Sequence, residues 1–163
     1  MRRRLGAIVV IGLLALSACE RREAAAPTPE TARFSHRLGA DISGDYRPVG
    51  EESSPVASLF VGQAAAFTAW EAGQGGAVPL ILSLNVPQGP MRVTPDAYAI
   101  TDDTVQMTGS ASGGGIVRLQ GRIDQGALAT ARRNLGDQTP VITGTVSVDG
   151  QRTAFALSWW GGD

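Results

Sequence analysis

The amino-acid sequence predicts a mainly β protein, a small antiparallel β-barrel or sandwich of about seven strands with one or two short helices. Asp149-Gly150 separates two long segments in which apolar and polar residues alternate, a pattern typical of a hairpin with a type I′ turn. A second pair of alternating segments flanks the run Gly113-Gly114-Gly115. Helix signals are confined to two short stretches. A barrel and a sandwich with a helix over one open end both satisfy this order.

The pairing register of the last hairpin can be derived from the turn and checked against the distribution of apolar residues on the two faces. If Val148 pairs with Gln151, Phe155 falls opposite Gly144, and its ring can cover the space that the glycine leaves. One face then carries the apolar side chains and the other the polar ones, as a sheet over a core requires. The apolar face holds Ile142, Val146 and Val148 on the first strand and Phe155, Leu157 and Trp159 on the second.

The earlier strands are shorter and less regular. Val105 and Met107 alternate with polar residues, as do Val117, Leu119 and Ile123 after the glycine run. The remaining expected strands cover residues 42–46, 58–61, 78–86 and 98–101.

Two helices are expected between the strands. Asp124 can cap a helix that runs to Leu135, with Leu128 and Ala131 on the same stripe and Gly136 beyond its end. Residues 64–72 can form the other, with Phe67 and Trp70 on one face and Gly73 as the stop. A bulged strand over residues 59–70 is the alternative for this second stretch.

The first nineteen residues have the features of an export and sorting signal. Three arginines precede the apolar run from Leu5 to Leu16, which closes on Ser17-Ala18-Cys19. The four residues 16–19 resemble the lipobox of bacterial lipoproteins. The resemblance implies cleavage before Cys19, acylation of Cys19, and outer-membrane sorting because Glu20 rather than Asp follows. The apolar run is also too short to span a bilayer.

We therefore expect a signal peptide over residues 1–18, a lipidated Cys19 with a flexible tether over 19–37, and one β-rich globular domain over 38–163. The tether is rich in charge, Ala and Pro and has little apolar surface to bury. The lipid anchor would hold the protein at the outer membrane with its domain facing the periplasm.

The net charge and the single cysteine argue against several classes of partner and site. The signal region contains three of the 14 basic residues and no acidic one, so the remaining chain has 11 basic against 15 acidic residues and a formal charge of −4. This balance argues against nucleic acid and against anionic headgroups as partners. Cys19 is the only cysteine, so lipidation leaves no thiol for a disulfide or a metal site.

The residues that could support catalysis are few. His36 is the only histidine, and we expect it to be solvated at the edge of the domain. No nucleophile motif, zinc-ligand spacing or calcium-loop order is present. We therefore expect no enzyme activity, no catalytic residue, no metal site and no cofactor.

Trp160 is the first candidate contact residue. Neighbours on a strand point to opposite faces, so Trp160 should lie on the face away from Trp159 and the core. Tyr46 in the first expected strand and Trp70 in the first expected helix are further candidate contacts for a partner or ligand.

These features favour a non-enzymatic, outer-membrane-anchored periplasmic lipoprotein that binds an envelope protein or helps to maintain the envelope. The alternative is a carrier or sensor of a small apolar ligand inside the β-domain. In either case we expect attachment to the membrane through acyl chains on Cys19, no nucleic-acid partner, and a monomer.

Overall fold

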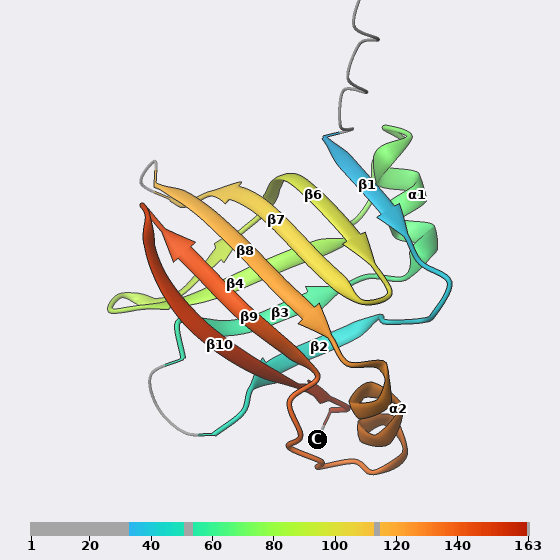
Figure 1. Cartoon of the computed structure of the whole chain (residues 1–163). Helices are drawn as coiled ribbons and strands as arrows, with labels where there is room; N and C mark the ends of the chain where they lie inside the picture. Colours follow the sequence, from blue (N-terminus) through green and yellow to red (C-terminus); the bar gives the residue numbers. More distant parts are fainter. Residues whose placement is uncertain (1–32, 51–53, 113–114, 163) are drawn as a thin grey trace, which may run out of the picture. The chain divides into compact units, whose positions relative to one another are not determined.

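The computed structural model describes residues 33–50, 54–112 and 115–162, which form a single ten-stranded sheet with two helices (Figure 1). The mainly β fold class is confirmed, but there are ten strands rather than about seven. The sheet curls into a half-barrel and is not divided into the two layers of a sandwich. Its strand order is β1-β6-β7-β8-β9-β10-β2-β3-β4-β5. The predicted signal peptide, Cys19 and most of the predicted tether lie outside the described residues.

The last hairpin has the predicted register. Strands β9 (Ile142–Val148) and β10 (Gln151–Trp160) pair with Val148 opposite Gln151 and Phe155 opposite Gly144. Both turn residues have positive φ, 49° at Asp149 and 89° at Gly150, as a type I′ turn requires. The turn chemistry and the alternation therefore specify the same pairing.

A row of two glycines lets the sheet curl. Gly121 of β8 (Ile116–Ile123) lies directly opposite Gly144 of β9, and Phe155 follows in the same row. A Cβ atom at Gly144 would overlap the backbone carbonyl of Gln120, so the two strands approach too closely for any other residue. Glycine at this point allows the bend that a curved sheet needs.

The edge strand β1 (Phe34–Arg37) corrects the predicted domain boundary. These four residues were expected in the tether, but they pair in parallel with β6 (Pro95–Thr101), with Phe34 opposite Tyr98. The sheet is therefore not wholly antiparallel, and the folded part begins before residue 38. One apolar residue among polar neighbours did not reveal the strand, because its burial depends on a distant partner.

Strand β5 (Gly89–Val93) is the other element that the sequence did not indicate. It contains glycine and proline, which are unfavourable inside a sheet. As an edge strand it pairs only with β4 (Leu80–Val86), so Pro90 can be accommodated.

The other strands keep the predicted order with shifted ends. The expected first strand over residues 42–46 is β2 (Gly44–Pro48), and the expected strand 58–61 is β3 (Val56–Val61). Strand β6 begins three residues earlier than expected. Strand β7 (Thr104–Ser110) completes the sheet and pairs with β6 and β8.

Helix α2 (Gln125–Arg133) covers one end of the half-barrel (Figure 1). Asp124 caps it as predicted, because its carboxylate accepts a hydrogen bond from the Ala127 N–H at 2.9 Å. Leu128 and Ala131 are buried, as expected. The helix ends before Leu135, whose side chain is 70% exposed rather than part of the buried stripe.

Helix α1 (Ala64–Glu71) packs against β1 at another part of the sheet. Gly73, at a φ of 66°, follows its end, which confirms the helix and excludes the bulged strand that was the alternative.

The core fills the inner side of the curled sheet. Its largest fully buried side chains come from β2, β3, β4, β6, β8, β9, β10, α1 and the segment before β2, and include Tyr46, Leu59, Phe67, Leu82, Ile100, Leu119, Ile142 and Leu157. Burial of this kind is the main source of stability for a domain that has no disulfide.

Candidate functional site

The structure places the three candidate contact residues, Trp160, Tyr46 and Trp70, in different environments. Trp160 lies on the outer face of the sheet, Tyr46 lies in the core, and Trp70 lies on helix α1. They do not form one site.

Trp160 is half-buried and belongs to a row of outer-face residues that crosses four strands. It pairs with Asp45 of β2, Asp45 pairs with Phe60 of β3, and Phe60 pairs with Ile81 of β4. Phe60 is 40% exposed, one of three large apolar side chains with this much exposure among the described residues. The row therefore presents two aromatic side chains, with Asp45 between them, on the side of the sheet away from the core.

Arg47 completes this surface. Its guanidinium carbon lies 3.2 Å from the centroid of a Trp160 ring, so the planar cation covers part of the indole face. Ser158, which pairs with Arg47, is only 4% exposed. We call Arg47, Phe60 and Trp160 the aromatic–arginine surface. Tryptophan and arginine are the residue types that contribute most to binding energy in protein interfaces.

The sequence indicated only part of this surface. Trp160 followed from strand alternation in the last hairpin, but Phe60 and Arg47 did not, because the strands that carry them were poorly defined. The alternation in Leu59-Phe60-Val61 was the available signal, since an outward Phe lies there between two buried residues.

The structure buries Tyr46 completely, so this candidate contact for a partner or ligand is not exposed at the surface. Its hydroxyl donates a 2.6 Å hydrogen bond to the Ile42 carbonyl, and burial raises the pKa of the phenol above its ordinary value. Tyr46 thus ties the segment before β2 to the core.

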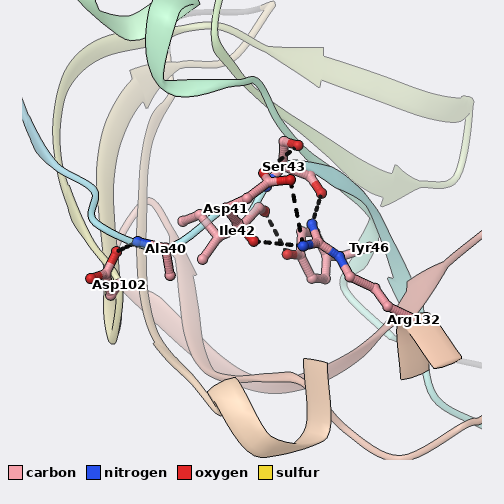
Figure 2. A network of polar contacts seen from close by, with 7 residues as sticks. All are labelled: Ala40, Asp41, Ile42, Ser43, Tyr46, Asp102 and Arg132. Carbon is pink, nitrogen blue, oxygen red and sulfur yellow. Dashed lines mark hydrogen bonds and ion pairs between the residues drawn. The ribbon is translucent and has the colours of Figure 1, made fainter. Parts of the chain in front are cut away.

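Figure 2 shows the polar network around this segment. Arg132 of α2 donates to the carbonyls of Asp41 and Ser43, both at 2.7 Å, and its guanidinium lies 3.5 Å from the Asp41 carboxylate. The Ser43 hydroxyl and N–H both donate to Asp41 Oδ1. These two hydrogen bonds, with the nearby Arg132 charge, lower the pKa of Asp41. The network joins α2 to the chain ahead of β2.

Asp102 binds the N-terminal end of the segment that precedes β2, at Gly39 and Ala40. Its Oδ1 accepts hydrogen bonds from the N–H groups of Gly39 at 2.9 Å and Ala40 at 3.0 Å. Each polar side chain in this network therefore contacts backbone or its neighbour, which is the pattern of a structural clamp and not of a reactive centre.

Trp70 and His36 belong to a second cluster, between β1, β6 and α1. The Phe34 ring lies edge-on to Trp70 at 6.2 Å and tilted against Tyr98 at 5.1 Å. His36 stacks on Phe67, and its Nδ1 lies 2.9 Å from Glu71 Oε2. His36 was expected to be solvated, yet its side chain is only 18% exposed, because β1 brings it against the helix.

In this cluster the Thr68 hydroxyl, the His36 imidazole and the Glu71 carboxylate lie in a row in space, with each group next to the following one. Thr68 Oγ1 lies 3.5 Å from His36 Nε2, and Glu71 accepts from the Tyr98 hydroxyl at 3.1 Å as well as contacting His36. However, the Thr68 hydroxyl donates to the Ala64 carbonyl of its own helix at 3.1 Å. Burial, and then the Glu71 contact, raise the pKa of Tyr98. The geometry attaches β1 to α1 and does not present an activated nucleophile.

Two further observations concern the part of the chain that the structure describes. Within it, no three His, Cys, Asp or Glu side chains gather in a way that could hold a metal ion. None of the helices in the described ranges has the length and apolarity needed to cross a membrane.

Comparisons of the chain with protein-family models, with curated proteins and with solved structures found no significant match. The functional argument therefore depends on the residues and surfaces described above.

Proposed function

We propose that the protein is an outer-membrane lipoprotein, anchored through Cys19, whose β-domain binds an envelope protein and has no enzymatic role. The observation that carries this proposal is the aromatic–arginine surface. A tryptophan held under an arginine, and an exposed phenylalanine two strand spacings away across Asp45, offer two aromatic contacts with polar groups around them.

The packing of the core favours this function over the carriage of an apolar ligand. The inner-face residues that would line a ligand cavity are packed against one another, with Met107 3%, Leu119 1% and Leu157 0% exposed. Side chains fill small closed barrels in the same manner. Because the core is filled, we expect binding to occur at the outer surface of the sheet and not inside it.

The position of the surface also suits a binding role. Phe60 lies on β3, which pairs with β2 on one side and β4 on the other, whereas Trp160 ends β10 beyond the last β9 pair and has β2 alone as its neighbour. Phe60 is therefore presented on a rigid scaffold, and the stacked Arg47 restrains Trp160, so a partner would order few residues on contact and lose little conformational entropy.

A photo-crosslinking residue at position 60 tests this proposal in living cells. Because a benzoyl-phenylalanine resembles the native Phe60, it should leave the fold intact and yield a discrete adduct with one envelope protein. The same residue in place of Thr143, which is exposed on the outer face of β9, is the matched control. The substitution Trp160→Ala should weaken the position-60 adduct.

The absence of an adduct at position 60, or the same adducts from positions 60 and 143, would contradict the proposal. Loss of the adduct at position 60 in cells where the protein is also missing from the membrane fraction would instead point to failed anchoring. Fractionation of the same cells separates these two results.

A further inference from the structure

The outer face of the sheet has a second distinctive region, on strands β6 to β10. Two shallow pockets of about 240 and 290 Å³ lie there and share Arg118 and Gln120 in their linings. Together they form a continuous depression, which we call the basic trough. Its charged lining residues are Arg33, Arg118 and Arg152, and its uncharged polar ones include Gln120, Thr145 and Ser147.

The register of the strands explains how the arginines come together. Arg118 of β8 pairs with Ser147 of β9, and Ser147 pairs with Arg152 of β10. The two arginines therefore lie in one row, two strand spacings or about 10 Å apart. Small alanine, serine and threonine side chains around them keep the floor of the trough low.

Among the described residues, no carboxylate lines the trough, so the overall acidic balance that argued against anionic headgroups does not hold at this part of the surface. The carboxylates at its margins have other partners. Asp96 contacts Arg33 and accepts from the Ser110 hydroxyl, and Asp149 accepts from the Ile116 N–H at 3.0 Å. Within the described residues, Arg118 and Arg152 make no ion pair, and both are exposed. This concentrates positive charge at one part of the surface.

The described part of the chain begins at the basic trough. Arg33, the first described residue, lines the trough beside Arg118. Fourteen residue steps separate it from Cys19, so the chain between them spans at most about 50 Å. If Cys19 is acylated, the trough is confined near the surface of the membrane that holds the acyl chains, at a high effective concentration of headgroups.

We propose that the basic trough docks on the anionic phospholipid headgroups of the membrane in which the protein is anchored. The inference rests on the proposed lipid anchor. Guanidinium groups bind phosphate through paired hydrogen bonds, and hydroxyl and amide side chains between them add further donors. A lipid anchor with a basic surface is a combination that gives firm and oriented attachment.

Docking would also orient the domain. Arg152 and Trp160 lie on the same outer face of β10, but they are eight residues apart, which is about 26 Å along an extended strand. Contact of the trough with lipid would therefore occupy one end of this strand and leave the aromatic–arginine surface at the other end.

A pair of matched labels tests the proposal on the full lipidated protein, purified from its host membrane and reconstituted into vesicles. With Cys19 acylated, a new cysteine is the only free thiol. Ser147→Cys places a fluorophore in the trough, and Ser83→Cys places it on the outer face of β4, at a serine that is likewise half-buried. The vesicles contain headgroup-quencher lipid and either phosphatidylcholine alone or equal parts of phosphatidylcholine and phosphatidylglycerol.

We expect the label at position 147 to be quenched in the phosphatidylglycerol vesicles, and the quenching to decrease in high salt. The double substitution Arg118→Ser and Arg152→Ser should lower the ratio of docked to free domain roughly 30-fold, because each surface arginine contributes about one factor of five. The label at position 83 should remain unquenched.

Equal quenching at both positions, or equal quenching of the label at position 147 in the two kinds of vesicle, would overturn the docking proposal. Flotation of the same samples reports on the anchor. A protein that floats with vesicles but is not quenched at position 147 overturns docking alone. A protein that does not float overturns the anchor and the docking that depends on it.

Discussion

Arg47 of β2 covers a ring of Trp160 of β10, with the guanidinium carbon 3.2 Å from the ring centroid. The pair lies on the outer face, so it adds little to the core but fixes the shape of the surface that we assign to partner binding. A stacked arginine keeps the indole in one orientation while its charge remains in solvent.

The Arg47–Trp160 pair should show a small favourable coupling in a double-mutant cycle. We expect Arg47→Ala, Trp160→Ala and the double variant to give a coupling free energy of about 0.5–1 kcal/mol in urea unfolding, as for exposed cation–π pairs. Each single variant should remain folded. A coupling above about 2 kcal/mol would mean that the pair stabilises the fold as core residues do and is not simply an exposed contact surface.

Gly44 is predicted to be a position that accepts no side chain. It has a φ of 145°, and a Cβ atom there would overlap the indole nitrogen of Trp159. Gly44→Ala should lower the free energy of unfolding by about 3 kcal/mol, because backbone strain and displacement of the tryptophan combine. Gly89 has a φ of 110° with open space around it, so Gly89→Ala should cost only about 1 kcal/mol. Equal losses on thermal or urea unfolding would show that the Trp159 contact contributes nothing.

Arg132 is predicted to stabilise the attachment of α2. Arg132→Met removes two hydrogen bonds to the carbonyls of Asp41 and Ser43 and should cost about 2 kcal/mol of unfolding free energy. Arg133 lies next to it in the same last turn and is exposed, so Arg133→Met should change stability by less than about 0.5 kcal/mol. Hydrogen exchange should also become faster in α2 of the first variant only. Similar effects of both substitutions would attribute the loss to helix charge rather than to the clamp.

Asp41 gives the clamp a dependence on pH. Its pKa is lowered by the Ser43 hydrogen bonds and by Arg132, so its stabilising contribution is present above the unfolded value of 3.8 and is lost as pH falls through the lower folded value. Unfolding midpoints of the native chain should therefore exceed those of Asp41→Asn near neutral pH, and the difference should disappear as pH falls through the lowered folded pKa of Asp41. A constant difference over that range would exclude ionisation of Asp41 as the cause.

The local parts of the fold were predictable from the sequence. Asp149-Gly150, the alternation around it and Asp124 are signals within a few residues, and they specify the last hairpin and the cap of α2. The order of the elements left a barrel and a sandwich with a helix over one open end as alternatives, so the position of α2 at one end of the half-barrel was not specified by it. Strand β1 forms because Phe34 meets Tyr98 and Trp70, which are distant in the sequence. A single apolar residue in a polar stretch carries no such information.

The candidate site was predictable to a similar extent. Alternation placed Trp160 on the outer face, but pairing between β10, β2 and β3 decides that Arg47 and Phe60 join it. The same alternation could not show that Tyr46 is buried, because its hydroxyl is satisfied by the Ile42 carbonyl only when the preceding segment folds back. The basic trough likewise depends on the register of three strands, which aligns Arg118 with Arg152.

Native mass spectrometry of the protein, released gently from its host membrane, tests the central proposal most directly. We predict a chain that begins at Cys19, carries the mass of its acyl groups, and is accompanied by one envelope protein in fixed ratio. Trp160→Ala should retain the acyl mass and lose that protein. A chain without acyl mass would contradict the anchor, and a partner that remains bound to the Trp160→Ala variant would contradict the role of the aromatic–arginine surface.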